Sequence, residues 1–184
     1  MSTNPGAVRR TAGLLALTLF VAVAASAQDA KSVAAAKQLG ATLDRLKLDS
    51  IATADPAEPG TFVAALYFQG AQLLVVSAKY SAPALLVDKL AKKDYRDVYI
   101  DLNAASVAGT KIFVMDQNAD GLVARPGDNA PDSWEQASKT TAFDGDWKKA
   151  KISEDEYTKT FAAADEKYAR ILTLLTEHAK KGGS

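Results

Sequence analysis

The sequence predicts an α+β fold in which a mostly antiparallel core lies between a leading helix and a long C-terminal helix. Two apolar segments of strand length, within Thr61–Tyr80, are separated only by Gln69-Gly70, which is typical of a β-hairpin. Apolar residues recur with helical spacing before this hairpin and, more regularly, near the end of the chain. Because both faces of the first hairpin segment are apolar, we expect the hairpin to lie in a closed barrel or in a sheet covered by helices.

Residues 1–27 have the three parts of a secretory signal peptide. A polar stretch ends in an arginine pair, residues 12–24 are uncharged and apolar, and an Ala-Ser-Ala pattern for signal peptidase ends at residue 27. We therefore expect residues 28–184 to form a single α+β domain in the periplasm or outside the cell. The arginine pair leaves both the general secretory and the twin-arginine route open. A retained N-terminal anchor is the alternative, although a membrane span needs ~20 apolar residues.

Composition narrows the classes of function. Basic and acidic residues number 22 each, which argues against nucleic acid as the main partner. No stretch after residue 27 is long and apolar enough to span a membrane. The chain has no cysteine and a single histidine, His178, so we expect neither a Ser-His-Asp or Cys-His arrangement nor a zinc site.

An amphipathic helix is expected over Ser32–Leu48, where leucine and alanine recur at three- and four-residue spacing. Asp49–Asp55 follows as a short strand. Two prolines and a glycine directly after it predict a turn into the hairpin. The core of the domain is expected over about residues 43–125.

A short helix is expected to begin at Pro83, because proline suits the first turn of a helix. Arg96–Leu102 alternates apolar and polar residues, as a half-buried strand does, and Lys111–Met115 is expected to be another strand. Asp120-Gly121 is then expected to turn the chain into a last short strand, Leu122–Arg125.

The remaining residues divide into a loop and a helix. Residues 126–151 are polar and irregular, and we expect a long surface loop held by its two tryptophans. A C-terminal helix is expected over residues 153–180, where Ser153 and Glu156 form a capping-box pattern. Apolar residues spaced four, three and four apart run from Tyr157 to Leu175 as one continuous seam. This seam must pack on the core, on the first helix, or on a second copy of the chain.

The turn Ser77–Ser81 is the leading candidate for a binding site. Hydroxyl groups, an ammonium group and backbone N–H groups gather there, where a strand is expected to end and a helix to begin. A helix N-terminus favours bound anions, and phosphate in particular. The alternative is an ordinary start of a helix.

Asp116–Gly121 has the sequence D-Q-N-A-D-G, which matches the first half of an EF-hand calcium loop. Position twelve of that motif, a bidentate glutamate, is here Gly127, and no helices are expected around the loop. Turns between strands are rich in Asp, Asn and Gly for purely local reasons. We therefore expect a plain connection without a metal, and a calcium-dependent structural protein is the weaker alternative.

The order of elements over Leu43–Asp116 carries a family resemblance. A helix leads into I-A-T-A-D-P, the hairpin T-F-V-A-A-L-Y-F-Q-G-A-Q-L-L-V-V-S-A-K-Y follows, and after a helix with basic residues come R-D-V-Y-I-D-L and K-I-F-V-M-D. This order resembles the FMN-binding split-barrel (pyridoxamine-phosphate-oxidase-like) family. The resemblance implies a split β-barrel-like core, FMN as cofactor and, for an enzyme, flavin-dependent oxidoreductase chemistry. It also implies which residues would approach the FMN phosphate: Thr53, Ser77, Lys79, Ser81 and Lys89.

The resemblance further implies a homodimer with flavin at the subunit interface, which an exposed apolar seam on the last helix would suit. The chain departs from the family pattern because its hairpin turn has no arginine and residues 126–151 have no counterpart. Several family members have lost flavin, so the fold alone does not imply activity. We expect an exported protein that binds FMN or a related phosphate-bearing small ligand. The alternative is a periplasmic binding or structural module without a cofactor.

Overall fold

The computed structural model describes residues 30–68, 72–84, 87–88, 98–100, 114–116, 120–127, 131–136 and 139–182. Its two long helices are α1 (Lys31–Leu46) and α3 (Glu154–Gly182). The described strands form two antiparallel sheets, one of three strands and one of four. The strands are β1 (Ser50–Ala54), β2 (Thr61–Phe68), β3 (Gln72–Lys79), β4 (Val98–Ile100), β5 (Val114–Asp116), β6 (Ser133–Gln136) and β7 (Lys139–Ala142).

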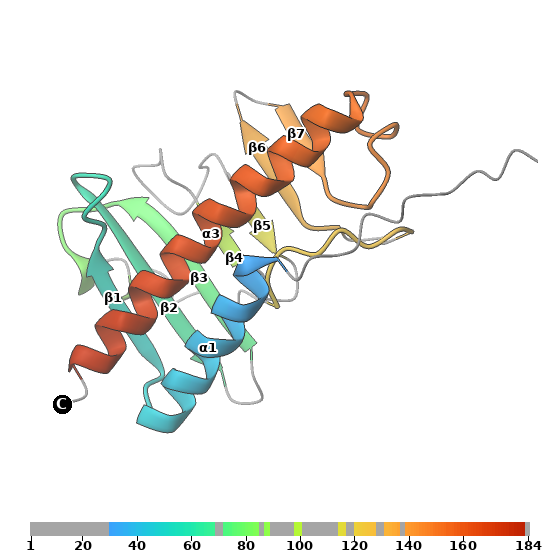
Figure 1. Cartoon of the computed structure of the whole chain (residues 1–184). Helices are drawn as coiled ribbons and strands as arrows, with labels where there is room; N and C mark the ends of the chain where they lie inside the picture. Colours follow the sequence, from blue (N-terminus) through green and yellow to red (C-terminus); the bar gives the residue numbers. More distant parts are fainter. Residues whose placement is uncertain are drawn as a thin grey trace, which may run out of the picture.

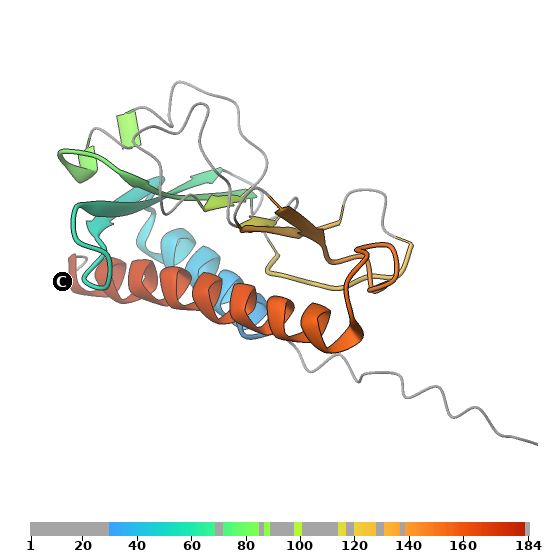
Figure 2. The same ribbon diagram turned by 90° about the horizontal axis from the view of Figure 1, so that it is seen from above.

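The predicted α+β class, the leading helix and the long C-terminal helix are therefore confirmed. The described strands form two open sheets in the orders β1-β2-β3 and β4-β5-β6-β7, and they do not close into a barrel. Figure 1 shows α1 and α3 side by side over the sheets, and Figure 2 shows both helices on one face of a layer in which β4 lies beside β3. No helix in the described part of the chain is long and apolar enough to cross a membrane.

The hairpin predicted within Thr61–Tyr80 is the pair β2–β3, and β2 is the central strand of its sheet. Both faces of this sheet are buried, as its two-sided apolar pattern predicts. One face packs against α1 and α3 through Val63, Ala65, Leu73 and Val75. The opposite face forms a separate cluster built on Ala64, Leu66, Leu74 and Val76. We call the first of these two faces the helix-facing side of the sheet.

The apolar seam of α3 is buried within the chain. Tyr168, Ile171 and Leu175 lie in the main core together with Leu39 and Leu43 of α1. Since intramolecular packing covers this seam, it does not provide the exposed dimer surface that the family resemblance implied. At the start of α3, Ser153 Oγ accepts a hydrogen bond from the backbone N–H of Glu156 at 3.1 Å, as the capping-box pattern predicts.

The loop expected over residues 126–151 is only partly a loop. It contains the hairpin β6–β7, and both Trp134 and Phe143 are buried in the main core. Burying two large aromatic side chains stabilises the fold more than leaving them on the surface, and their contacts order the chain between them. The expectation of a long surface loop was therefore wrong.

The strand expected over Leu122–Arg125 is also wrong, since these residues belong to neither sheet. Their backbone groups bind side chains instead of a neighbouring strand. The N–H of Leu122 donates to Ser32 Oγ at 2.9 Å, and the N–H of Val123 donates to Asp132 Oδ2 at 2.8 Å. The other expected strands correspond to β1, β4 and β5, and residues 83–84 and 87–88 of the short helix expected after β3 are helical.

Candidate functional site

Three of the five predicted phosphate-binding residues lie on the helix-facing side of the first sheet. Thr53, Val63 and Ser77 are cross-strand neighbours in one row, and Lys79 lies in the next row opposite Thr61. Thr53 and Ser77 are thus two strand spacings apart, about 10 Å. Ser81 follows β3 and is exposed, and Lys89 lies outside the described residues.

The side chain of Ser77 has no exposed surface, while Lys79 is exposed and Thr53 is half-buried. Ser77 lies on the same face of β3 as Leu73 and Val75, which pack in the main core with α1 and α3. A ligand therefore reaches the Ser77 hydroxyl only after neighbouring side chains move. The structure brings Ser77 and Lys79 to one place but does not leave that place open.

Two buried hydroxyls at this end of the sheet have no hydrogen-bond partner among the described residues. They are Thr61 Oγ1 and Ser77 Oγ, and the residues are 1% and 0% exposed. Leaving a buried hydroxyl unpaired costs about 1–3 kcal/mol. Such groups are therefore usually completed by water or by a ligand. We call Thr61, Ser77 and Lys79 the hairpin-end site.

A partly buried ion pair adjoins the hairpin-end site. The guanidinium group of Arg170 donates to both oxygens of Asp55, at 2.8 and 2.7 Å. The backbone N–H of Asp55 donates to the carbonyl of Thr61 at 2.9 Å, which places the pair next to that residue. Burial by itself would raise the pKa of Asp55, but hydrogen bonds from Arg170 and from the Ala57 N–H outweigh it and lower the pKa.

Lys167 adds a third cation to this end of the sheet. Burial lowers the pKa of its ammonium group, while the nearby carboxylates of Glu58 and Asp55 oppose that effect. Its Nζ also lies 5.9 Å from the centroid of the Trp134 ring, a cation–π geometry. Among the described residues at this end of the sheet, the three cations Lys79, Lys167 and Arg170 outnumber the two carboxylates, those of Asp55 and Glu58. The hairpin-end site therefore lies in a region of net positive charge.

Sequence reasoning missed Thr61, Lys167 and Arg170. Thr61 had a signal, because a hairpin with its turn near Gln69-Gly70 places the first residue of one strand opposite the last residue of the other. The sequence contains no local signal that would place Arg170 or Lys167 at this site. Arg170 is 115 positions from Asp55 in the chain, and only the packing of α3 on the sheet brings the two together.

A second buried polar cluster lies at the end of β5. Asp116 Oδ2 accepts hydrogen bonds from the Gly121 N–H at 2.7 Å and from the Tyr168 hydroxyl at 3.1 Å. Burial, followed by the negative charge of Asp132, raises the pKa of Asp116 to about 7, against the effect of these two hydrogen bonds. Among the described residues, no three His, Cys, Asp or Glu side chains form a group that could hold a metal ion.

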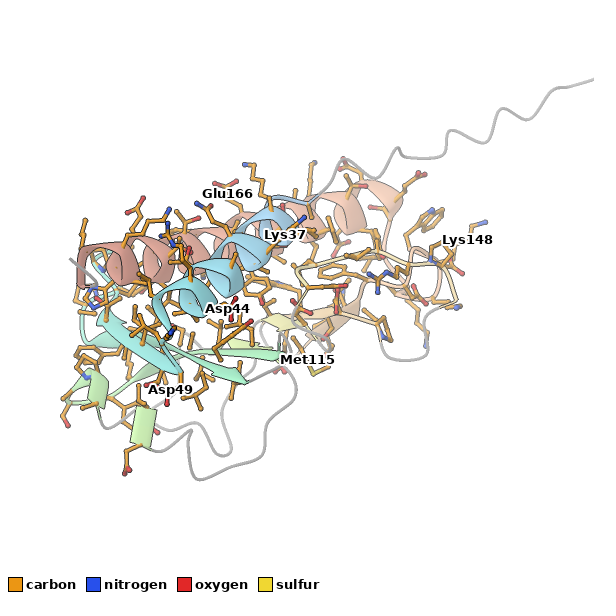
Figure 3. The ribbon with its side chains drawn as sticks, turned by 90° about the horizontal axis from the view of Figure 1, so that it is seen from below. Lys37, Asp44, Asp49, Met115, Lys148 and Glu166 are labelled. Carbon is orange, nitrogen blue, oxygen red and sulfur yellow. The ribbon has the colours of Figure 1, made fainter. Side chains whose placement is uncertain are left out.

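A shallow groove of about 570 Å³ lies on the outer side of α3, next to the start of α1 and the β1–β2 turn. Its charged side chains include Lys31 and Glu166, which pair with each other, and Arg170, which pairs with Asp55. Figure 3 shows Glu166 pointing away from the sheets. Because all of its charged side chains except Glu177 are in these ion pairs, the groove gives a weaker indication of a ligand than the hairpin-end site does.

Comparison with known proteins gives no match: no family model, no curated protein and no solved structure matches the chain.

Proposed function

We propose that the protein is exported and binds a phosphate-bearing small ligand, FMN or a related molecule, at the hairpin-end site of a split-barrel-like fold. The observation that supports this proposal is the pair of buried, unpartnered hydroxyls of Thr61 and Ser77 in a region of net positive charge. Hydroxyl donors and cations are the groups that bind phosphate oxygens.

In this proposal Thr61 and Ser77 donate hydrogen bonds to the phosphate, and the ammonium group of Lys79 balances its charge. Arg170 contributes to the positive field while Asp55 holds its guanidinium group in place. Lys79 is exposed and lies opposite Thr61, so its flexible side chain reaches a phosphate bound there once the packed side chains around Ser77 move. Bound FMN would supply the redox chemistry, and the protein would supply position and charge.

Thermal unfolding with three ligands tests the proposal. FMN and inorganic phosphate are each expected to raise the melting temperature, whereas riboflavin, which lacks the phosphate, is not. A ligand at one hundred times its Kd stabilises a protein by about 2.7 kcal/mol. A visible spectrum of protein purified from its native compartment then shows whether flavin is the bound form. If none of the three ligands shifts the transition, the phosphate proposal is wrong.

Variants at the site give the matched comparison. Thr61→Val and Ser77→Ala are expected to lose the response to phosphate and FMN. Ser81→Ala, on an exposed residue beyond β3, is the control and is expected to keep that response. An unchanged response in both Thr61→Val and Ser77→Ala would show that the ligand binds elsewhere.

The second candidate is a binding or structural module without a cofactor. The complete burial of the Ser77 side chain favours it, because no ligand reaches that hydroxyl in this conformation. It predicts a colourless protein in which Thr61→Val is more stable than the natural chain, since the change removes an unpaired buried hydroxyl at nearly constant volume. The two candidates thus differ in the colour of the protein and in its response to phosphate.

A further inference from the structure

Two distant parts of the chain donate hydrogen bonds to the carboxyl group of Asp116, the last residue of β5, and α1 packs against one of them. The side chains of Asp116 and of Tyr168, on α3, have no exposed surface, and the two are hydrogen-bonded. The other donor to Asp116 Oδ2 is the N–H of Gly121. Gly121 is packed so tightly against α1 that a Cβ atom there would lie 2.4 Å from the backbone of Val33. Asp116 therefore links the second sheet to both helices.

Among the described residues, the charged groups that act on Asp116 are the carboxylates of Asp132 and Asp120. Asp132, just before β6, is 6% exposed, and its negative charge acts directly on Asp116. Asp120 also acts on Asp116, and its carboxylate accepts a hydrogen bond from Arg125 at 2.9 Å. On α3, Tyr168 is the titratable group that contacts Asp116.

Nearby charges on the two helices are directed to other partners. Asp165, one turn before Tyr168, accepts hydrogen bonds from the backbone of α1. Lys31, in the first turn of α1, pairs with Glu166. The first turn of α1 reaches the loop after β5 through the Ser32 hydroxyl, which accepts a hydrogen bond from the N–H of Leu122. A hydrogen bond from the loop after β5 to α1 thus lies beside a buried acid.

We propose that Asp116 is a proton-controlled joint: with its proton it fastens the segment 120–123 and the second sheet to α1 and α3, and its ionisation beside Asp132 loosens them. A protonated carboxyl group keeps an oxygen to accept from Gly121 and Tyr168. Ionisation places a second negative charge in a buried site, where it is poorly solvated and close to Asp132.

The direction of the pH effect follows from linkage. Burial, and then Asp132, hold the pKa of Asp116 near 7 in the closed joint, whereas an exposed aspartate titrates near 3.9. The closed joint therefore binds more protons than the open one between about pH 4 and pH 7. Opening is expected to become easier by up to about tenfold per pH unit over that range, and to level off above about pH 7.

Amide hydrogen exchange of Gly121, Leu122 and Val123 between pH 5 and 8 measures this opening, after correction for the intrinsic pH dependence of exchange. The opening constant is expected to rise on the order of a hundredfold across this range, with most of the rise below pH 7. In Asp116→Asn, which keeps an acceptor oxygen but has no titrating group, the opening constant is expected to be independent of pH. The same pH profile in both proteins would overturn the proposal.

Two further variants keep the test decisive if Asp116→Asn does not fold. Asp132→Asn removes the nearby negative charge, so the pH at which the rise levels off is expected to move downward. An unchanged profile in this variant would also overturn the proposal. Asp144→Asn is the matched control, because Asp144 is also a buried aspartate. Burial by itself would raise the pKa of Asp144, but the hydrogen bonds that it accepts from the Asp146 N–H and from Lys149 outweigh burial and lower the pKa. It is expected to behave like the natural chain.

The measurements are made in EDTA and repeated with calcium chloride. The same profile under both conditions is expected when a proton controls the joint. A calcium-dependent loss of the pH effect would mean that a metal ion, and not a proton, occupies the cluster at the end of β5, and would overturn the proposal.

Discussion

The carboxylate of Asp165, on α3, caps the start of α1 at Ser32. Its two oxygens accept hydrogen bonds from the backbone N–H groups of Lys31, at 2.9 Å, and of Ser32, at 2.8 Å. The residue at the usual capping position of α1 is Ala30, whose side chain makes no such bond. A residue on α3, more than 130 positions away, thus performs the function that a neighbouring Ser, Asp or Asn usually performs.

We expect Asp165→Ala to lower the free energy of unfolding by about 1–2 kcal/mol, because two backbone donors at the start of α1 lose their partner. Glu166→Gln is the control. It changes the adjacent carboxylate, whose ion pair with Lys31 is exposed on both sides, and is expected to have no measurable effect. Denaturant unfolding compares the two variants, and equal losses would show that the cap does not stabilise the fold.

Gly121→Ala is expected to destabilise the protein by about 3 kcal/mol or more. Gly121 has φ +97°, and an added Cβ would lie 2.4 Å from the backbone of Val33, which cannot move without displacing α1. Gly127 has a similar φ of +79° but nothing within 4 Å of such an atom. Gly127→Ala should therefore cost only the backbone strain, about 1 kcal/mol. Thermal unfolding separates the two, and similar losses would contradict the close contact.

Arg170→Leu is expected to cost about 3 kcal/mol, because it leaves the Asp55 carboxylate buried without its partner. The side chain of Asp55 has no exposed surface, whereas that of Arg170 is 35% exposed. The control is Lys159→Ala, which breaks a pair with Asp155 that is largely exposed on both sides. It should change stability by a few tenths of a kcal/mol at most. A double variant, Asp55→Asn with Arg170→Leu, is expected to recover part of the loss.

The ion pair of Asp55 and Arg170 also predicts that the stability of the folded chain falls at acidic pH. Since the pKa of Asp55 is lower in the folded chain than its ordinary value, the stability it provides is present above that ordinary value and is lost as the pH falls through the lowered pKa. Thermal unfolding below pH 4 should therefore show a steeper loss in the natural chain than in Asp55→Asn. Parallel curves would contradict the assignment.

Phe143→Ala tests the burial of a residue in the stretch expected to be a surface loop. The Phe143 ring meets Tyr157 and Phe161 edge to face, with centroids 5.9 and 4.9 Å apart, and it has no exposed surface. We expect a loss of about 3–5 kcal/mol in denaturant unfolding. Thr140→Ala, at an exposed position of β7, serves as the polar comparison and is expected to have little effect. A small loss in the free energy of unfolding for Phe143→Ala would favour the surface loop expected over residues 126–151.

Regular local patterns were predicted well from the sequence. The seam and the capping signal of α3 lie within one helix, and the hairpin of β2 and β3 is marked by its own turn and its apolar faces. These features depend on neighbours within a few positions. The hairpin β6–β7 was missed because its strands are four residues each, which is too short for alternation to stand out.

At the candidate site, too, some residues could be predicted from local sequence and others could not. Ser77 and Lys79 were predicted from their place at the end of a strand, and the structure puts both on the helix-facing side of the sheet. The burial of Ser77 and the positions of Arg170 and Lys167 could not be predicted, because they depend on where α3 crosses the sheet.

By itself, the sequence determined the α+β class, the central hairpin and the two long helices, because hydrophobic periodicity and capping act over a few residues. Only the tertiary structure decided that the sheets stay open in the described residues, that α3 packs on α1, and that Asp165, Arg170 and Tyr168 each meet a partner far along the chain. The physical reason is that burial removes polar groups from water and makes each of them depend on whichever distant group the packing brings within hydrogen-bond reach.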